Sequence, residues 1–240
     1  MVSSMNFEIK KKFSNTIKFL RRIVYKTNWV NLRNVNPISD DFGWSRGKPI
    51  DRFYIEKFLN TNRSKINGDC GEVSERKYLN LYKNDLIKSA KIFDINLENK
   101  SADIYGDLAD FKQLHENLFD CFVCTQVLNF IFDFSSAIIG LHKILKPGGY
   151  LLLTVAGPTV HISKYDDIKW GDYWRFTETS ALKSFEKVFG KGNVKVEAYG
   201  NVLTSTAMMQ GLSSNELTKD ELNYKDTSYP LVITVIAKKI

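Results

Sequence analysis

A sixteen-residue segment in the second half of the 240-residue chain gathers ionisable and aromatic side chains. The segment is HISKYDDIKWGDYWRF, residues 161–176. Its ionisable side chains include His161, Asp166, Asp167 and Asp172, and its rings include Tyr165, Trp170, Tyr173 and Trp174. A histidine or a carboxylate can take a proton from a hydroxyl group. Aromatic rings beside carboxylates can also hold a sugar, because the rings stack on its apolar faces while the acids bind its hydroxyls. The segment therefore predicts a polar-ligand site, with Asp172 and His161 as candidate catalytic residues.

The same segment also has a structural interpretation. Aromatic side chains can pack a loop onto a sheet, and we favour that role for Trp174 and Phe176. For Asp172, capping of a nearby group and catalysis remain equally good explanations. Arg175 is close enough along the chain to pair with Asp172.

The chain around this segment alternates short apolar runs with helical stretches. Strands are predicted near residues 69–73, 91–95, 102–105, 120–125, 150–156, 194–198 and 231–237, and helices near 50–59, 76–82, 135–145 and 179–189. Strand, helix and strand in succession indicate a parallel sheet covered on both faces. The last two strands suit an antiparallel edge. We therefore predict an α/β fold, a Rossmann-like doubly wound, mostly parallel seven-stranded sheet.

Charge is distributed unevenly along the chain. The formal net charge is +7, with 34 basic and 27 acidic residues. The first 33 residues hold eight basic side chains and one acidic one, so the remaining 207 residues are balanced. A globular nucleic-acid binder would carry its positive charge on the folded surface, so the sequence argues against a nucleic-acid partner. We predict two parts, a basic helical arm over residues 1–33 and an α/β domain over residues 34–240.

The arm has the pattern of an amphipathic helix. Phe13, Ile17, Leu20 and Val24 recur at helical spacing, with most basic residues elsewhere on the helix. This apolar stripe could dock on the body or on a second subunit, or it could adsorb to an anionic membrane. No apolar run is long enough to cross a bilayer, and three cysteines make no disulfide framework. We expect a cytoplasmic protein, with peripheral attachment to the inner face of the membrane as the alternative that the arm leaves open.

Three segments carry a family resemblance. They are ADIYGDLAD (residues 102–110), FDCFVCTQVLNFI (119–131) and LHKILKPGGYLLLTV (141–155). In this order they resemble the class I S-adenosylmethionine-dependent methyltransferases. The flanking segments at 39–59 and 164–177 resemble a type 11-like bacterial subfamily that is often associated with surface-glycan biosynthesis. The resemblance covers roughly residues 37–238.

The resemblance implies a function and a cofactor. The expected activity is methyl transfer from S-adenosyl-L-methionine to a small-molecule or glycan acceptor, by O-methylation. In open α/β sheets, ligands bind at the carboxyl ends of the strands. The cofactor residues implied there are Glu72 and Ser74 in the first turn, Asp94 (or Asn96) for the ribose, Asp107 for the adenine, Leu108 and Gln126. The substrate-binding residues implied are Arg46, Tyr54, Tyr165, Tyr173 and Arg175. No metal is expected, since Cys121 and Cys124 would face opposite sides of a strand.

The first turn departs from the family pattern. Ser74 stands where a glycine is expected in GDCGEVSERKY, and Gly71 should weaken the strand before it. If the turn needs a left-handed residue, serine there is strained by about 1 kcal/mol. This leaves a second hypothesis, in which the chain is a catalytically degenerate, methyltransferase-like binding or partner protein.

Overall fold

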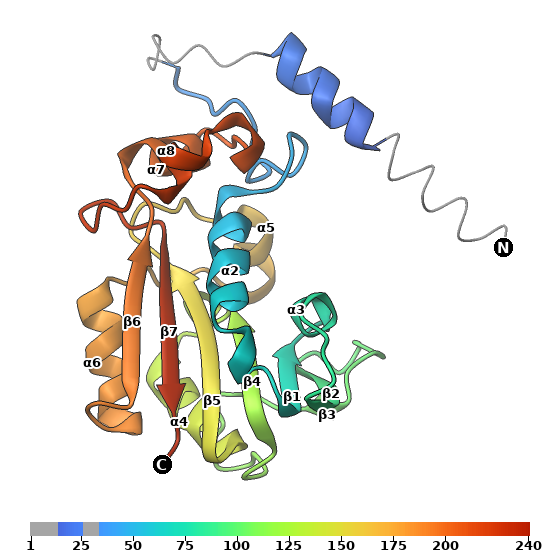
Figure 1. Ribbon diagram of the computed structural model, residues 1–240, viewed down its shortest axis with the longest axis vertical. Helices are drawn as coiled ribbons and strands as arrows, with labels where there is room; N and C mark the ends of the chain where they lie inside the picture. The colour runs from blue at the N-terminus through green and yellow to red at the C-terminus, as the bar shows by residue number, and fades with distance from the viewer. Residues whose placement is uncertain (1–13, 26–33) are drawn as a thin grey trace, which may run out of the picture.

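The computed structural model describes residues 14–25 and 34–240, and its centre is a seven-stranded sheet (Figure 1). The strand order is β3-β2-β1-β4-β5-β7-β6. The strands are β1 (Gly68–Val73), β2 (Ile87–Asp94), β3 (Ile104–Tyr105), β4 (Phe119–Thr125), β5 (Leu145–Ala156), β6 (Val194–Tyr199) and β7 (Val232–Lys238). All seven predicted strands are present, which confirms the predicted fold class.

The direction of the strands follows the doubly wound pattern. Strand β1 pairs in parallel with β2 and β4, and β4 pairs in parallel with β5. Strand β7 runs antiparallel to both β5 and β6, so the antiparallel strand is inserted next to the edge of the sheet. The carboxyl ends of β1, β2, β3, β4 and β5 therefore meet along one side of the sheet.

Helices cover both faces. They are α2 (Ile50–Thr61), α3 (Lys77–Leu81), α4 (Phe134–Ile144), α5 (Lys164–Trp170), α6 (Glu178–Phe189), α7 (Val202–Met209) and α8 (Lys219–Asn223). One hydrophobic core lies under α4 and α6, and a second lies under α2 and α7. Cys124 belongs to the first core and Cys121 to the second, which confirms that these thiols face opposite sides of β4.

Local sequence signals explain most of the helix boundaries. Thr177 and Ser180 form a capping box at the start of α6, and Asp133 accepts from the Ser136 N–H at the start of α4. The helix predicted near residues 135–145 is α4, which ends one residue earlier because β5 already begins at Leu145. The short helices α5, α7 and α8 were not predicted.

Gly71 has a packing role that the sequence did not reveal. A Cβ atom at this position would lie 2.6 Å from the Phe122 ring and 2.7 Å from the Phe119 ring. Contacts that short are impossible, so only glycine lets these two rings pack against β1. The glycine that we expected to weaken the strand is therefore required by the core beside it.

The described part of the basic arm is a helix over residues 14–24. Its stripe residues Ile17, Leu20 and Val24 are exposed, so they do not pack on the body, and Phe13 lies outside the described residues. For the described part, the hypothesis that the stripe docks on the chain's own body is therefore wrong. Among the described residues, no helix has the length and hydropathy needed to cross a membrane.

Candidate active site

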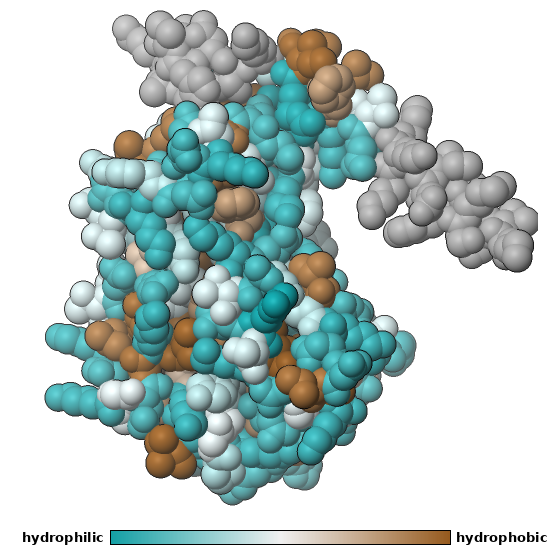
Figure 2. Space-filling view, in the orientation of Figure 1, coloured by the Kyte–Doolittle hydropathy of each residue, from teal (hydrophilic) through white to brown (hydrophobic). Residues whose placement is uncertain are grey.

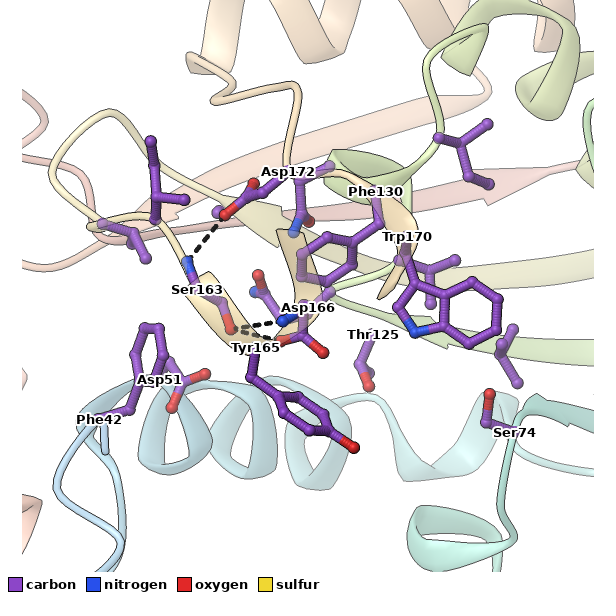
Figure 3. A pocket seen from close by; sticks show the side chains of 18 of the residues that line it. Phe42, Asp51, Ser74, Thr125, Phe130, Ser163, Tyr165, Asp166, Trp170 and Asp172 are labelled. Atoms are coloured by element: carbon purple, nitrogen blue, oxygen red, sulfur yellow. Dashed lines mark hydrogen bonds between the residues drawn. The ribbon is translucent and has the colours of Figure 1, made fainter. Parts of the chain in front are cut away.

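A single large cavity lies at the carboxyl ends of the parallel strands (Figure 3). The turns that follow β1, β2, β3 and β4 form one side of it, and the segments 37–44 and 160–175 form the other. Its volume is about 1610 Å³, which exceeds the range of about 300–1,000 Å³ typical of a pocket for one drug-sized ligand. The cavity therefore has room for two ligands side by side.

Two predicted cofactor residues, Asp94 and Asp107, lie at the carboxyl ends of the neighbouring strands β2 and β3 and line the cavity. Asp94 ends β2 and pairs in register with Tyr105 at the end of β3, two residues before Asp107. The Asp94 carboxylate accepts from the Asn96 N–H at 2.9 Å and from Asn99 Nδ2 at 2.7 Å. Since a carboxylate has about four acceptor sites, Asp94 retains capacity for ligand hydroxyls.

The next turns add further predicted residues to the same side of the cavity. Asp107 accepts from the Ala109 N–H at 2.8 Å, which fixes its carboxylate at the cavity. The buried Leu108 and the partly exposed Gln126 also line the cavity. The structure thus brings the predicted adenine and ribose contacts together, whereas their contact with a cofactor stays a prediction.

Ser74 adopts the left-handed conformation that the sequence raised as a possibility. Its φ is +64°, and the turn is held by a bond from its N–H to the Phe93 carbonyl at 2.9 Å. Of the four described non-glycine residues with positive φ, three line this cavity: Phe42, Ser74 and Gln126. Backbone strain of this kind concentrates at functional sites, so the distribution marks the cavity as the site.

Glu72 lies beneath this turn and is only 3% exposed. Its carboxylate accepts from the backbone N–H groups of Tyr78 and Leu79, at 3.0 and 2.8 Å, and so caps the start of α3. Burial raises the pKa of Glu72 to about 7, while those two backbone hydrogen bonds oppose the increase. Glu72 therefore shapes the first turn by holding α3 against β1.

The raised pKa of Glu72 predicts a pH-dependent stability. The folded chain holds the proton of Glu72 more tightly than the unfolded chain does, so protonation of Glu72 stabilises the fold. This stabilisation is complete below pH 4.5 and is lost as the pH rises through about 7. The free energy of unfolding of the wild type should therefore fall by about 3 kcal/mol between these limits, relative to Glu72→Gln. Urea unfolding of both proteins across this pH range measures the difference. Parallel stability curves for the two proteins would contradict the assignment.

Asp172 is held by an ion pair and is not available as a base. Its carboxylate, 2% exposed, accepts from Arg175 Nη1 at 2.5 Å and Nη2 at 2.8 Å, and from the Ser163 N–H at 3.0 Å. Burial opposes ionisation, but the bonds from Arg175 and Ser163 outweigh it and lower the pKa of Asp172. We therefore correct its assignment as a catalytic residue to a structural one, and the predicted pairing with Arg175 is confirmed.

His161 is the other predicted catalytic residue, and it lines the cavity. Its Nδ1 is buried and has no hydrogen-bond partner among the described residues. The ring stacks on Phe42, with centroids 4.1 Å apart and planes 14° apart. Burial lowers the pKa of His161, and the nearby Arg175 adds to the decrease. The imidazole is therefore neutral near pH 7 and can accept a proton.

The predicted substrate-binding residues divide into two groups. Tyr165 and Tyr173 line the cavity with exposed rings (Figure 3 shows Tyr165). Arg175 also lines it, but its guanidinium is occupied by Asp172 and by the carbonyls of Val160 and His161. Arg175 therefore fixes the shape of the segment that carries the two tyrosines.

Two predicted substrate residues do not reach the cavity. Tyr54, 1% exposed, lies on the buried face of α2 and packs near Phe53 and Tyr199. Arg46, 3% exposed, pairs with Glu216. Both assignments are corrected, because neither side chain is among the described residues that line the cavity.

The preference for packing at Trp174 and Phe176 is confirmed. Phe134 of α4 contacts both rings edge to face, with centroids 5.3 Å apart in each case. The Trp174 indole N–H also donates to the Phe132 carbonyl at 3.1 Å. These contacts anchor the segment after α5 to the body and so define the wall of the cavity.

Asn129 is a cavity residue that the sequence analysis missed. It is 3% exposed, and its Oδ1 has no hydrogen-bond partner among the described residues. Its carbonyl accepts from the N–H groups of Tyr173 and Trp174, at 2.9 and 3.2 Å. A buried oxygen without a partner is costly, so this atom can accept a hydrogen bond from a ligand or an ordered water. Its only sequence signal was its place in the loop after β4.

The cavity is acidic although the chain is basic. Among the described residues that line it, ten are acidic and three are basic. The three basic ones are Arg52, Lys164 and Arg175. Field lines concentrate in a cleft with one dominant sign of charge, so this lining attracts cationic ligands and repels anionic ones.

Comparison with known proteins agrees with this geometry. Residues 70–153 match a family model described as a methyltransferase domain, which covers β1 to β5. No sequence of a curated protein matches the chain. A methyltransferase structure from Archaeoglobus fulgidus shares 17% identity over 78% of this chain and 94% of that one, with a TM-score of 0.50. The similarity to the Archaeoglobus fulgidus structure shows the fold.

Two further solved structures are similar to this chain. A methyltransferase from Mesorhizobium loti is 13% identical over 79% of this chain and 98% of that one, with a TM-score of 0.49. A putative methyltransferase from Bacillus halodurans is 14% identical over 77% of this chain and 98% of that one, with a TM-score of 0.48. The domain match supports a methyltransferase.

Proposed function

We propose that this chain transfers a methyl group from S-adenosylmethionine to a hydroxyl group of a small-molecule or glycan acceptor. One observation carries the proposal. One cavity joins strand-end carboxylates on one side to a neutral His161, whose Nδ1 has no partner among the described residues, on the other. The volume of about 1610 Å³ accommodates both cofactor and acceptor.

The residues on the strand-end side fit the cofactor. Asp94 would accept from the ribose hydroxyls and Asp107 from the adenine amino group, while the buried Leu108 offers an apolar contact. The acidic lining suits a cationic sulfonium. When bound, the cofactor supplies an activated methyl group, so the protein's remaining tasks are alignment and proton removal.

The opposite side of the cavity would hold the acceptor. His161 would take the proton from the acceptor hydroxyl, and Asn129 Oδ1 would accept a second hydrogen bond from the acceptor. The exposed rings of Tyr165 and Tyr173 would stack on apolar faces of a sugar or a similar molecule. The acidic lining favours a neutral acceptor over a phosphorylated or carboxylated one. A glycan acceptor agrees with the subfamily resemblance.

We also propose a reducing compartment, the cytoplasm, as the site of action. Cys70, Cys121 and Cys124 are all buried and unpaired. Burial raises the pKa of the Cys124 thiol above its ordinary range. A thiol that stays protonated is a packing element and not a reactive group.

The second candidate function is a non-catalytic binding protein that keeps the same cavity. Ser74 is the observation that favours it, because its Cβ occupies space at a turn where a glycine would let the backbone approach a ligand closely. Asp94, Asp107 and the neutral His161 favour the enzyme. Cofactor binding separates the two functions directly.

Calorimetric titration with S-adenosylhomocysteine tests the proposal. Wild type should bind, and Ser74→Gly should bind more tightly, because glycine has no Cβ at the turn that the cofactor must approach. The same substitution should raise the free energy of unfolding by about 1 kcal/mol, because glycine adopts φ near +64° without strain. Ser74→Ala is the matched control: it removes the hydroxyl but keeps the Cβ, so it should show no gain. Binding by Ser74→Gly alone would favour the binding protein. Weaker binding by Ser74→Gly than by wild type would instead make the hydroxyl a cofactor contact.

A further inference from the structure

The helix over residues 14–24 has an apolar face that is exposed in the part of the chain that the structure describes. Its apolar residues are Ile17, Phe19, Leu20, Ile23 and Val24, each between 39% and 70% exposed. At about 100° per residue, these five fall within an arc of about 160°. Figure 2 shows apolar side chains on this helix beside hydrophilic ones. An apolar arc of this width usually faces a core.

The opposite face of the same helix is cationic. Lys18, Arg21 and Arg22 fall within an arc of about 100° on the side away from the apolar residues. No acidic residue occurs between positions 9 and 39 of the sequence. An apolar face backed by lysine and arginine is the composition of helices that lie in the surface plane of a membrane.

The helix is attached to the body at one end and leaves its apolar face free. Arg22 Nη1 donates to the carbonyl of Arg46 at 2.8 Å, and Arg46 Nη2 donates to the carbonyl of Tyr25 at 3.0 Å. Arg46 is itself fixed by its ion pair with Glu216. The attachment uses the cationic side and the end of the helix, so the five apolar residues remain available for another surface.

We propose that this helix binds an anionic membrane surface through its apolar face. Charge complementarity decides between the two occupants that the sequence left open. The first 33 residues carry a net charge of +7 and residues 34–240 are balanced, so a second copy offers the arm no net opposite charge. An anionic bilayer offers both an apolar layer for Leu20 and negative headgroups for Lys18 and Arg21.

The attachment through Arg46 also links the helix to the wall of the cavity. Arg46 follows the segment 37–44, which forms part of the cavity wall. Figure 1 shows the helix at the end of the molecule toward which the parallel strands point. A membrane-bound helix would hold this rim of the cavity close to the lipid surface.

Co-sedimentation with vesicles tests the membrane proposal on the full chain. Wild type should sediment with vesicles of equal parts phosphatidylglycerol and phosphatidylcholine, and not with phosphatidylcholine alone. Raising the salt from about 0.1 M to about 1 M should release it, because the Debye length shortens from about 10 Å to about 3 Å. Leu20→Asp should lower the bound-to-free ratio by about tenfold or more, since a leucine side chain would no longer enter the apolar layer.

Matched controls separate membrane binding from other causes. Leu86→Asp changes a similarly exposed leucine before β2 and should bind as wild type does. Arg21→Glu should lose binding to the anionic vesicles, and all three variants should retain the melting temperature of the wild type. No binding of wild type, or equal binding of Leu20→Asp, would overturn the proposal. A dimer that Leu20→Asp dissociates, without any vesicle binding, would assign the face to a second copy instead. Vesicle binding needs no methyl transfer, so this result is independent of the proposed activity.

Discussion

Replacing His161 with glutamine is expected to lower kcat for methyl transfer by about 100- to 10,000-fold, the usual contribution of a positioned base. The variant removes the imidazole nitrogen that would take the acceptor's proton. The other ionisable candidate, Asp172, is tied to Arg175 and cannot replace it. Turnover is measured with labelled S-adenosylmethionine and the acceptor that a transfer screen identifies.

Two controls make the His161 result specific. His142→Gln changes another half-buried histidine whose pKa is also lowered by burial, but which packs against Phe189 outside the cavity. It should leave kcat unchanged. The wild-type rate should fall as the pH drops through a pKa below 6.5, because protonation of His161 removes the base. Full activity of His161→Gln, or a rate that does not change on the acidic side, would contradict this role.

Asp107→Ala and Asp94→Ala are each expected to weaken S-adenosylhomocysteine binding by about 1–3 kcal/mol, because each removes a hydrogen-bond acceptor from a partly buried ligand. Titration calorimetry gives the affinities, and thermal unfolding checks that the variants fold. Asp110→Ala is the matched control, since Asp110 follows in the same turn and does not line the cavity. It should bind as wild type does.

Asp94 needs one additional variant. Its carboxylate also holds the loop after β2 through Asn96 and Asn99, so alanine could act by loosening that loop. Asp94→Asn keeps an acceptor for one of these bonds and removes the charge. A loss shared by alanine and asparagine would support the ribose contact, whereas unchanged affinity in all the Asp94 and Asp107 variants would exclude both cofactor assignments.

The sequence by itself determined the fold and the cofactor side of the site. Strand and helix patterns are local, and short turns force consecutive elements to pack as neighbours. Because Asp94 ends β2 and Asp107 follows the end of the adjacent parallel strand β3, the order of strands was enough to bring them together. The left-handed conformation of Ser74 could likewise be expected, since the turn after the first strand belongs to the same local pattern.

Only the tertiary structure decided the acceptor side, because there the role of each side chain depends on partners far away in the sequence. Arg46 was a candidate ligand contact until Glu216, 170 residues later, occupied its guanidinium. Residues 42 and 161 meet as a ring stack that no local pattern could predict. Asp172 and His161 were equivalent candidates in one short segment. The fold separated them, because it closed an ion pair on the carboxylate and left the buried imidazole nitrogen without a partner among the described residues.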